Sequence, residues 1–266
     1  MSAEVIRSFF PILLPQAESN SHVAPLINAL FPKYIQKMCP VPAIHLQGNF
    51  ELKWPTVAVA CIAGGLLSLL AGGRMICRSA SKKGFFTWGF ALFWYGIMCL
   101  GGLFYHCIKP SVVFRNVDVI ATACSSISVV AGSILADDTA LSQRLPLLVI
   151  YVSTAVAAIG GVELVPEFLY LGPTAVAFVA AAWFIWRVFT GNGVKWCEDM
   201  AVKWWCALAA GGAIVGLGSV VCDKWLCLML GSNFLLYFFV GCNIALFGLC
   251  QIVIELQNSA REDKHS

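Results

Sequence analysis

The sequence is poor in charge. Only 12% of its 266 residues are Asp, Glu, Lys or Arg, about half the share in a soluble domain, while 59% are hydrophobic and the mean hydropathy is +0.82. This composition excludes an ordinary soluble globular protein and predicts an integral membrane protein. The net charge of +3 comes from basic residues scattered at the ends of apolar runs. Because they form no basic stripe, we expect no nucleic-acid partner.

Several motifs are also missing. The chain has no Cys-x-x-Cys pair, which argues against a structural zinc site, and no His-Glu-x-x-His, Gly-x-Ser-x-Gly or P-loop sequence. It has no Asn-x-Ser/Thr sequon to report which side of the membrane a loop faces. Common hydrolase and nucleotide-binding classes are therefore disfavoured.

Long apolar runs dominate what is there. A bilayer core of about 30 Å is crossed by about 20 apolar residues in a helix, and seven runs reach this length: 54–73, 85–108, 116–135, 145–165, 168–186, 201–222 and 226–254. They are continuously apolar, so they lack the alternation of barrel strands. We predict an all-α integral membrane bundle of seven transmembrane helices, with an N-terminal interfacial segment at 1–53, the bundle at 54–255 and a tail at 256–266.

The positions of Lys and Arg predict the orientation of the bundle. Positive charge stays cytoplasmic in short loops. The first, third and fifth loops and the tail carry nine basic residues: Arg74, Arg78, Lys82, Lys83, Arg144, Arg187, Lys195, Arg261 and Lys264. The other loops carry three: Lys109, Arg115 and Lys224. We therefore expect an exoplasmic N-terminus and a cytosolic C-terminus, in the plasma membrane or an endomembrane.

The cysteines, glycines and tryptophans have packing interpretations. Six of the twelve cysteines lie away from the ends of the runs, where we expect small buried packing residues: Cys61, Cys99, Cys124, Cys206, Cys242 and Cys250. Four others lie near the exoplasmic side and could supply one disulfide: Cys39, Cys107, Cys222 and Cys227. Glycine pairs such as Gly101-Gly102 and Gly211-Gly212 predict close helix contacts. Tryptophans near the ends of runs, Trp88 among them, predict interface anchors.

Ionisable residues inside a membrane span are costly and mark either a site or a buried partner. Within "GLFYHCIKPSVVFRNVDVIA", His106 ends the second run and Asp118 opens the third, so both are expected at the exoplasmic edge. The predicted orientation brings further polar residues of the seventh run, Asn233 and Tyr237, to the same side. A polar network around a His–Asp pair is the strongest constellation in the chain.

These residues carry a resemblance. "LFYH" at 103–106, the aspartate that opens the third run, "AGS" at 131–133 and "GSNFLLYF" at 231–238 resemble the second, third and seventh helices of the CREST superfamily. Its members include alkaline ceramidases, progestin and adiponectin receptors and haemolysin-III-like proteins. The resemblance implies a seven-helix membrane protein. In family members that are enzymes, it implies a zinc amide hydrolase with three histidine ligands and a nearby serine and aspartate.

The chain departs from the family pattern at the metal ligands. Asn233 and Tyr237 stand where the seventh-helix histidines would be, and Gly102 stands where the family has its serine. An amide and a phenol do not replace two imidazoles at a zinc ion that needs three protein ligands. His106 is the one candidate metal ligand that remains, so we expect no resident zinc.

Three classes of function follow. We favour a non-catalytic CREST-like membrane protein with an exoplasmic-side polar pocket that either binds a membrane lipid or sterol-like ligand or has only a structural role. The pocket is formed by His106, Asp118, Asn233, Tyr237, Tyr105 and Ser232. The first alternative is a zinc-dependent lipid-amide hydrolase in which His106 and Asp118 are catalytic. The second is an unrelated seven-helix receptor or transporter, and no partner protein is indicated.

Overall fold

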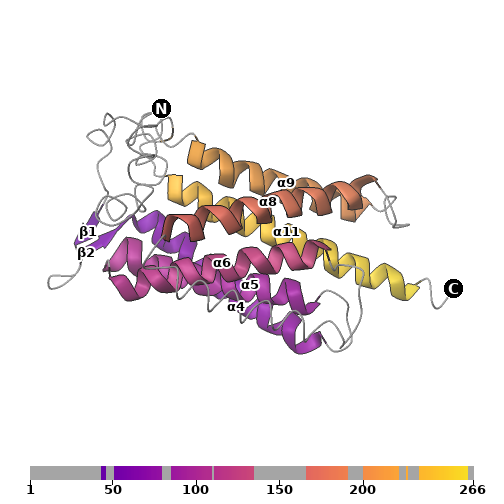
Figure 1. The fold of residues 1–266 in the computed structure, drawn as a ribbon, viewed down its shortest axis with the longest axis horizontal. Coiled ribbons are helices and arrows are strands. Elements are labelled where there is room, and N and C mark those ends of the chain that lie inside the picture. The colour runs from indigo at the N-terminus through magenta and orange to yellow at the C-terminus, as the bar shows by residue number, and fades with distance from the viewer. Residues whose placement is uncertain are drawn as a thin grey trace.

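The computed structural model describes residues 43–45, 51–79, 85–109, 111–134, 166–190, 200–221, 226 and 234–262, and these are mostly helical (Figure 1). Along the chain they form a short hairpin, β1 (Ala43–His45) and β2 (Glu51–Lys53), and then α4 (Pro55–Arg78), α5 (Phe85–Gly102), the π-helix η1 (Leu103–Ile108), α6 (Val112–Ile134), α8 (Pro166–Thr190), α9 (Met200–Val221) and α11 (Phe234–Glu262).

Among the described residues, five helical stretches are long and apolar enough to cross a membrane: Pro55–Arg78, Phe85–Ile108, Val112–Ser133, Met200–Ser219 and Leu235–Glu255. They coincide with the first, second, third, sixth and seventh predicted runs. The fifth run overlaps α8, which contains the apolar stretch Val176–Thr190. The fourth run, 145–165, lies outside the described residues. The chain is thus a helical bundle compatible with a multi-pass membrane protein.

Local sequence sets the ends of the elements. Pro55 opens α4 at the position where a missing backbone N–H costs nothing, and Trp54 before it has a positive φ of 50°. Helix α6 begins at Val112, four residues before the predicted Asn116, and the Ser111 hydroxyl accepts a hydrogen bond from the Phe114 backbone N–H at 3.3 Å. Helix α11 continues to Glu262, into the predicted tail.

The N-terminal hairpin is an addition to the expected all-α fold. Its antiparallel register pairs Ala43 with Lys53, Ile44 with Leu52 and His45 with Glu51. Strand β2 leads into Trp54 and packs against η1, at one end of the bundle (Figure 1). The hairpin is the part of the predicted interfacial segment 1–53 that the structure describes.

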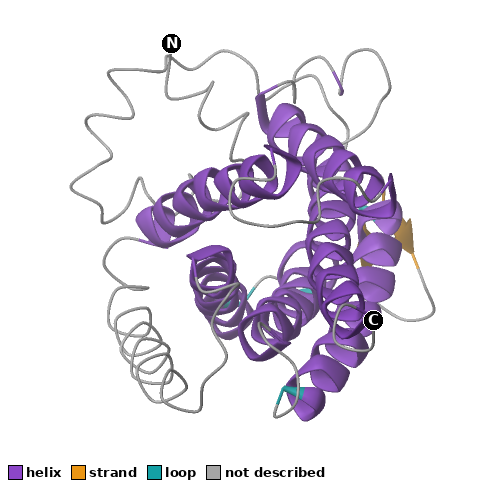
Figure 2. Cartoon of the chain, turned by 90° about the vertical axis from the view of Figure 1, so that its right-hand side faces the viewer, coloured by secondary structure: helices purple, strands orange, loops and turns teal. Residues whose placement is uncertain are grey.

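The helices pack in a closed order around the bundle. The main contacts join α4 to α5, α5 to α6, α6 to α8, and α9 to α11. Helix α11 also contacts α4 and α5, so the α9–α11 pair packs on the other helices (Figures 1 and 2). The contact between α8 and α9 is slight by comparison. The bundle is therefore tightly joined on one side and loosely joined between α8 and α9.

Glycines allow the closest of these contacts, as predicted. A Cβ on Gly212 of α9 would lie 2.5 Å from the Ala245 backbone nitrogen and 2.7 Å from the Gly241 carbonyl oxygen of α11. At Gly132 of α6, a Cβ would lie 2.7 Å from the Trp88 ring. Trp88 is therefore buried at 0% exposure against Phe184 and Gly132, and the interpretation of this residue as an interface anchor was wrong.

Seven of the eight cysteines in the described part of the chain are packing residues, and the eighth, Cys77, is exposed. Cys61, Cys99, Cys124, Cys206 and Cys250 are free and buried, and Cys242 is half-buried, which confirms that prediction. Cys107 is also a free, buried thiol, so it does not supply the disulfide considered for the exoplasmic side. Its three candidate partners lie outside the described residues.

Candidate functional site

The end of the second span is a π-helix. Helix α5 widens at Leu103, and the Lys109 backbone N–H donates to the Phe104 carbonyl oxygen, five residues back, at 2.8 Å. Such turns are rare and often occur at functional positions, because they re-aim side chains relative to the helix before them. Here the π-helical turn carries Tyr105, His106 and Cys107.

His106 and Asp118 lie together. The His106 Nε2 atom is 3.4 Å from the Asp118 Oδ2 atom, with side-chain exposures of 7% and 4%. Asp118 is in the second turn of α6, whose first turns contact η1. The pair attracts electrostatically when the imidazole is protonated, and burial strengthens that attraction because little water screens it. A buried carboxylate needs such a partner to be tolerated in a membrane bundle.

Closely packed groups surround this pair. The Tyr105 and His106 rings meet edge to face at 4.8 Å, and the fully buried Cys107 Sγ is 3.9 Å from the Trp54 carbonyl oxygen. On α5, Gly101 packs against the Asp118 backbone, since a Cβ there would lie 3.1 Å from the Asp118 nitrogen. We call η1, the hairpin, Trp54 and the His106–Asp118 pair the sealed end of the bundle.

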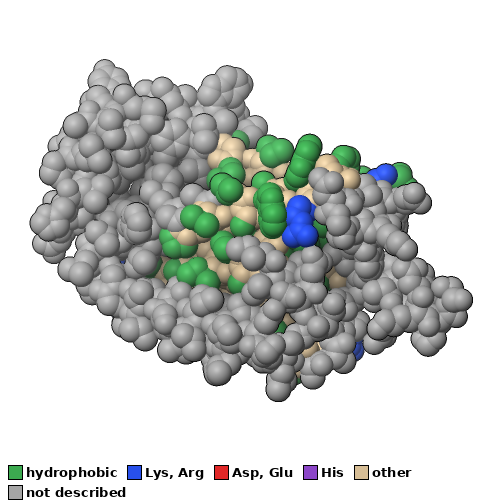
Figure 3. Space-filling model, turned by 45° about the vertical axis from the view of Figure 1, so that its right-hand side comes forward, with side chains coloured by type: hydrophobic (Ala, Val, Ile, Leu, Met, Phe, Trp, Pro, Cys, Tyr) green, Lys and Arg blue, Asp and Glu red, His purple; other side chains and the backbone are tan. Residues whose placement is uncertain are grey.

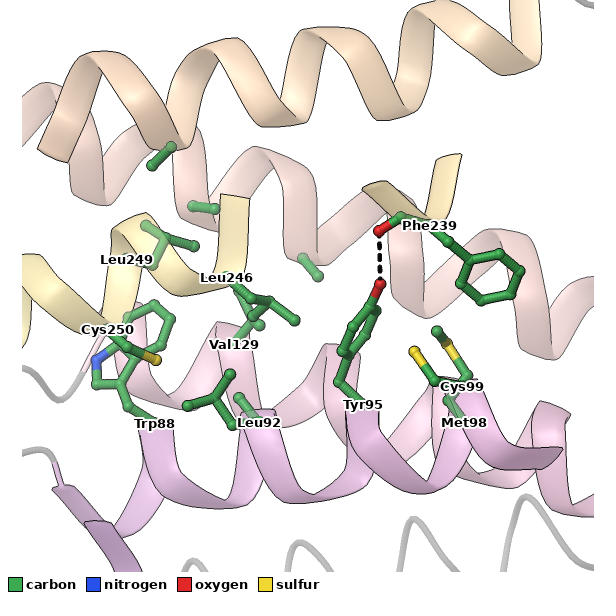
Figure 4. Close-up of a cluster of buried hydrophobic side chains, with 14 of the residues drawn as sticks. Trp88, Leu92, Tyr95, Met98, Cys99, Val129, Phe239, Leu246, Leu249 and Cys250 are labelled. Carbon is green, nitrogen blue, oxygen red and sulfur yellow. Dashed lines mark hydrogen bonds between the residues drawn. The ribbon is translucent and has the colours of Figure 1, made fainter. Parts of the chain in front are cut away.

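Gly102 faces the pair directly. A Cβ built on it would lie 3.5 Å from His106 Cδ2, 3.6 Å from Asp118 Oδ1 and 3.3 Å from Cζ of Phe239 on α11. Phe239 is buried, and its carbonyl oxygen accepts a hydrogen bond from the Tyr95 hydroxyl at 3.0 Å (Figure 4). The Phe239 ring and the Tyr95–Phe239 hydrogen bond thus join α5 to α11 beside the pair.

The structure describes one of the other three predicted pocket residues, Tyr237. Asn233 and Ser232 lie outside the described residues. Tyr237, which is half-buried, precedes Gly241 by one helical turn, and Gly241 packs on Gly212 of α9. At about 100° per residue, Tyr237 points about 200° away from Phe239. The structure therefore brings together His106, Asp118 and Tyr105 but places Tyr237 on the face of α11 toward α9.

A cavity of about 550 Å³ lies deeper in the bundle, on the other side of the Tyr95–Phe239 hydrogen bond. Its lining comes from α5, α6, α8, α9 and α11, and begins on α6 with Thr122, one turn beyond Asp118. Neither His106 nor Asp118 lines it. Its walls are almost wholly apolar, with alanines, Phe178, Phe238 and Leu246 prominent. Part of this wall, including Val129, Leu246 and Leu249, appears in Figure 4.

The sequence did not reveal this cavity, although one signal was present. Helix α6 carries serines and threonines at helical spacing in "TACSSIS". The prediction for this helix used "AGS" at 131–133, as part of the family resemblance, and not these hydroxyls. Most of the hydroxyls satisfy backbone carbonyls: Thr122 Oγ1 donates to Asp118 O at 2.8 Å, and Ser125 Oγ donates to Ala91 O at 2.9 Å. Which helix faces enclose a space depends on packing, which the sequence pattern does not give.

Within the described ranges, no group of three or more His, Cys, Asp or Glu side chains is placed to hold a metal ion. The His106–Asp118 pair supplies two metal ligands, whereas a catalytic zinc ion requires three protein ligands. The chain matches no protein-family model, no curated protein and no solved structure.

Proposed function

We propose that this chain is a multi-pass membrane protein that binds a lipid inside its helical bundle and does not catalyse a reaction on it. The observation that carries the proposal is the apolar cavity of about 550 Å³ between α5, α6, α8, α9 and α11. Its size falls within the range of about 300–1,000 Å³ of small-ligand sites, and such sites in bundles lie between helices. A cavity with these walls favours an apolar occupant.

A CREST-like arrangement is part of this proposal. Two features support it: His106 and Asp118 meet at the junction of the second and third spans, and Gly102 faces both. A serine at position 102, which the resemblance implies, would have its side chain beside the pair. The proposal includes seven spans, with the fourth at 145–165, an exoplasmic N-terminus and a cytosolic C-terminus, on the distribution of Lys and Arg.

The donor set does not fit the zinc ion that the resemblance implies. His106 and Asp118 are already paired, and Tyr237 lies on the face of α11 toward α9. A phenol also binds zinc poorly beside imidazole or thiolate. We therefore assign the pair a structural role: it gives the buried Asp118 side chain a polar partner and holds η1 on α6.

Lipid binding is tested by filling the cavity. Ala181 of α8 lines the cavity at 8% exposure, and Val179 of the same helix points outward at 72% exposure. The Ala181→Phe variant should carry at least tenfold less co-purified lipid per protein molecule than the wild type. The lipid is measured by solvent extraction and mass spectrometry. The Val179→Phe variant adds an aromatic ring on the lipid-facing side and should retain this lipid. Equal lipid content in both variants would refute the proposal.

A lipid-amide hydrolase is the second candidate, favoured by the buried His106–Asp118 pair at 3.4 Å. The test is the zinc content of the purified protein together with hydrolysis of a ceramide, in the wild type and in His106→Ala. One zinc ion per chain that is lost in the variant, together with lost hydrolysis, would establish the hydrolase. We expect neither zinc nor turnover in the wild type.

A further inference from the structure

The walls of the cavity restrict the chemistry of its occupant. None of the described residues that line it is charged, and a buried charge without a partner is costly in an apolar medium. A lipid whose charged headgroup entered the cavity would therefore leave that charge unpaired. The occupant should be neutral.

One polar feature remains in the lining. Ser126 of α6 and Thr174 of α8 face each other across the cavity wall, with their hydroxyl oxygens 3.5 Å apart. Hydroxyl hydrogen bonds are normally about 2.7–2.8 Å long, so this contact is weak and both oxygens can bond a third group. Ser126 is 7% exposed, so the feature is buried.

Two neighbouring hydroxyls have already used their donor hydrogens. Thr122 and Ser125, also in the lining, donate to backbone carbonyl oxygens at 2.8 and 2.9 Å. The residue before Thr174 is Pro173, which lies inside α8 and has no N–H to donate, so this turn of α8 lacks one backbone hydrogen bond. The Ser126–Thr174 pair is thus the polar position of an otherwise apolar cavity, and it suits one hydroxyl group of a ligand.

The cavity reaches the outer surface between α8 and α9. Trp186 and Phe189 of α8 and Ile214 of α9 line it, and they are 62%, 53% and 70% exposed. These helices make little contact with each other. Figure 3 shows hydrophobic side chains gathered over the described part of one outer face of the molecule, with Lys and Arg sparse on it. In a bilayer, an opening among such side chains faces lipid tails.

We infer that the cavity binds a neutral lipid with a single hydroxyl group, of the sterol type, which enters from the bilayer between α8 and α9 and bonds Ser126 and Thr174 through that hydroxyl. The inference rests on the proposed function and names its ligand class. A hydroxyl both donates and accepts, so it can bond both side-chain oxygens, whereas a hydrocarbon bonds neither. The rest of the ligand needs only apolar contact.

The experiment uses the full-length protein in detergent micelles with three probes: cholesterol, cholestane, which lacks the hydroxyl, and cholesterol sulfate, which is charged. We expect wild-type protein to bind cholesterol about tenfold more tightly than either analogue. Cholestane lacks the hydroxyl that forms the hydrogen bonds, and cholesterol sulfate would bring an unpaired charge into the apolar cavity. The Ser126→Ala/Thr174→Val variant should bind cholesterol and cholestane alike. Thr174→Ser keeps the hydroxyl and should keep the preference.

The outcomes separate the two proposals. If Ala181→Phe abolishes sterol binding but the wild type binds cholesterol sulfate or cholestane as well as cholesterol, lipid binding stands and the hydroxyl recognition is wrong. An unchanged preference in Ser126→Ala/Thr174→Val, with a normal thermal unfolding profile, also overturns the inference. If no probe binds and no lipid co-purifies with the wild type, the proposed function itself fails.

Discussion

The sealed end and the cavity lie one helical turn apart on α6, yet the first is tightly packed and the second encloses empty space. At the sealed end, Asp118 is 3% exposed and has His106 beside it, with the hairpin and η1 packed around the pair. At the cavity, the same helix presents Ser126 to a space of about 550 Å³. Polar groups are enclosed where helices close completely, and space is left where α8 and α9 separate. The ionisable residues His106 and Asp118, which are rare in membrane spans, therefore mark the tightly packed end of the bundle. The candidate binding site is lined instead by common small and apolar residues.

The largest effect should come from breaking the pair. In Asp118→Ala, the His106 imidazole loses its partner in a buried position, and we expect the free energy of unfolding to fall by about 3 kcal/mol. The measurement is denaturant unfolding in micelles for the wild type, Asp118→Ala, His106→Ala and the double variant. The double variant should lose less than the sum of the single losses. Additive losses would mean that the two residues are not coupled.

The second effect concerns the tight contact between α9 and α11. Gly212→Ala would drive a methyl group into backbone atoms of α11 at 2.5 and 2.7 Å, so the helices must separate, and we expect a loss of about 2 kcal/mol. Gly211 is the matched control, because no atom lies within 4 Å of a Cβ there. Gly211→Ala should leave stability unchanged or raise it by up to about 1 kcal/mol. Equal behaviour of the two variants would contradict this packing.

A third variant addresses the boundary between the two regions. Tyr95→Phe removes the hydroxyl that donates to the Phe239 carbonyl oxygen at 3.0 Å, and this should cost about 1 kcal/mol of unfolding free energy. Met98→Leu, a change of similar size at another cavity-lining position of α5, is the control and should cost less. If Tyr95→Phe is as stable as the wild type, this hydrogen bond does not hold α5 to α11.

The smallest effect should be at Gly102. Its added Cβ would meet side-chain atoms at 3.3–3.6 Å, whereas a Cβ on Gly101 would meet the Asp118 backbone nitrogen at 3.1 Å and Val117 Cγ1 at 3.0 Å. We expect Gly102→Ala to change stability by less than about 1 kcal/mol and Gly101→Ala to cost more. Thermal unfolding of both variants gives the comparison. The reverse order would place the pair differently from this structure.

The sequence predicted the helices well because apolar runs in a bilayer have few alternatives. It placed α4 and α5 within a few residues, and it brought His106 and Asp118 to neighbouring helix ends because a short loop joins them. It did not predict η1, because the sequence "LFYHCI" is compatible with an α-helix as well as with a π-helix. Trp88 was assigned to the interface from its position near the start of a span, but Gly132 on a distant segment makes room for its burial.

The cavity and the position of Tyr237 were beyond prediction for a related reason. Both depend on the rotation of α11 about its axis, and Gly241, Gly212 and Phe239 fix that rotation through contacts between segments far apart in the sequence. The motif spacing predicts a common helical face for Asn233 and Tyr237, and Asn233 lies outside the described residues. It could not say which neighbour that face meets.

At the sealed end, the direction of the His106 side chain depends on the number of residues in the π-helical turn. A turn closed by i→i+5 hydrogen bonds holds one residue more than an α-helical turn, and the bond from Lys109 to Phe104 closes it here. Deleting one residue between Gly102 and His106 would remove the extra residue and allow an α-helical turn to form, which would re-aim the side chains inside the turn, His106 among them. His106 would then keep its chemistry and lose its partner. Among short insertions and deletions, those in this segment should be the least tolerated, even where they remove only a leucine or a phenylalanine.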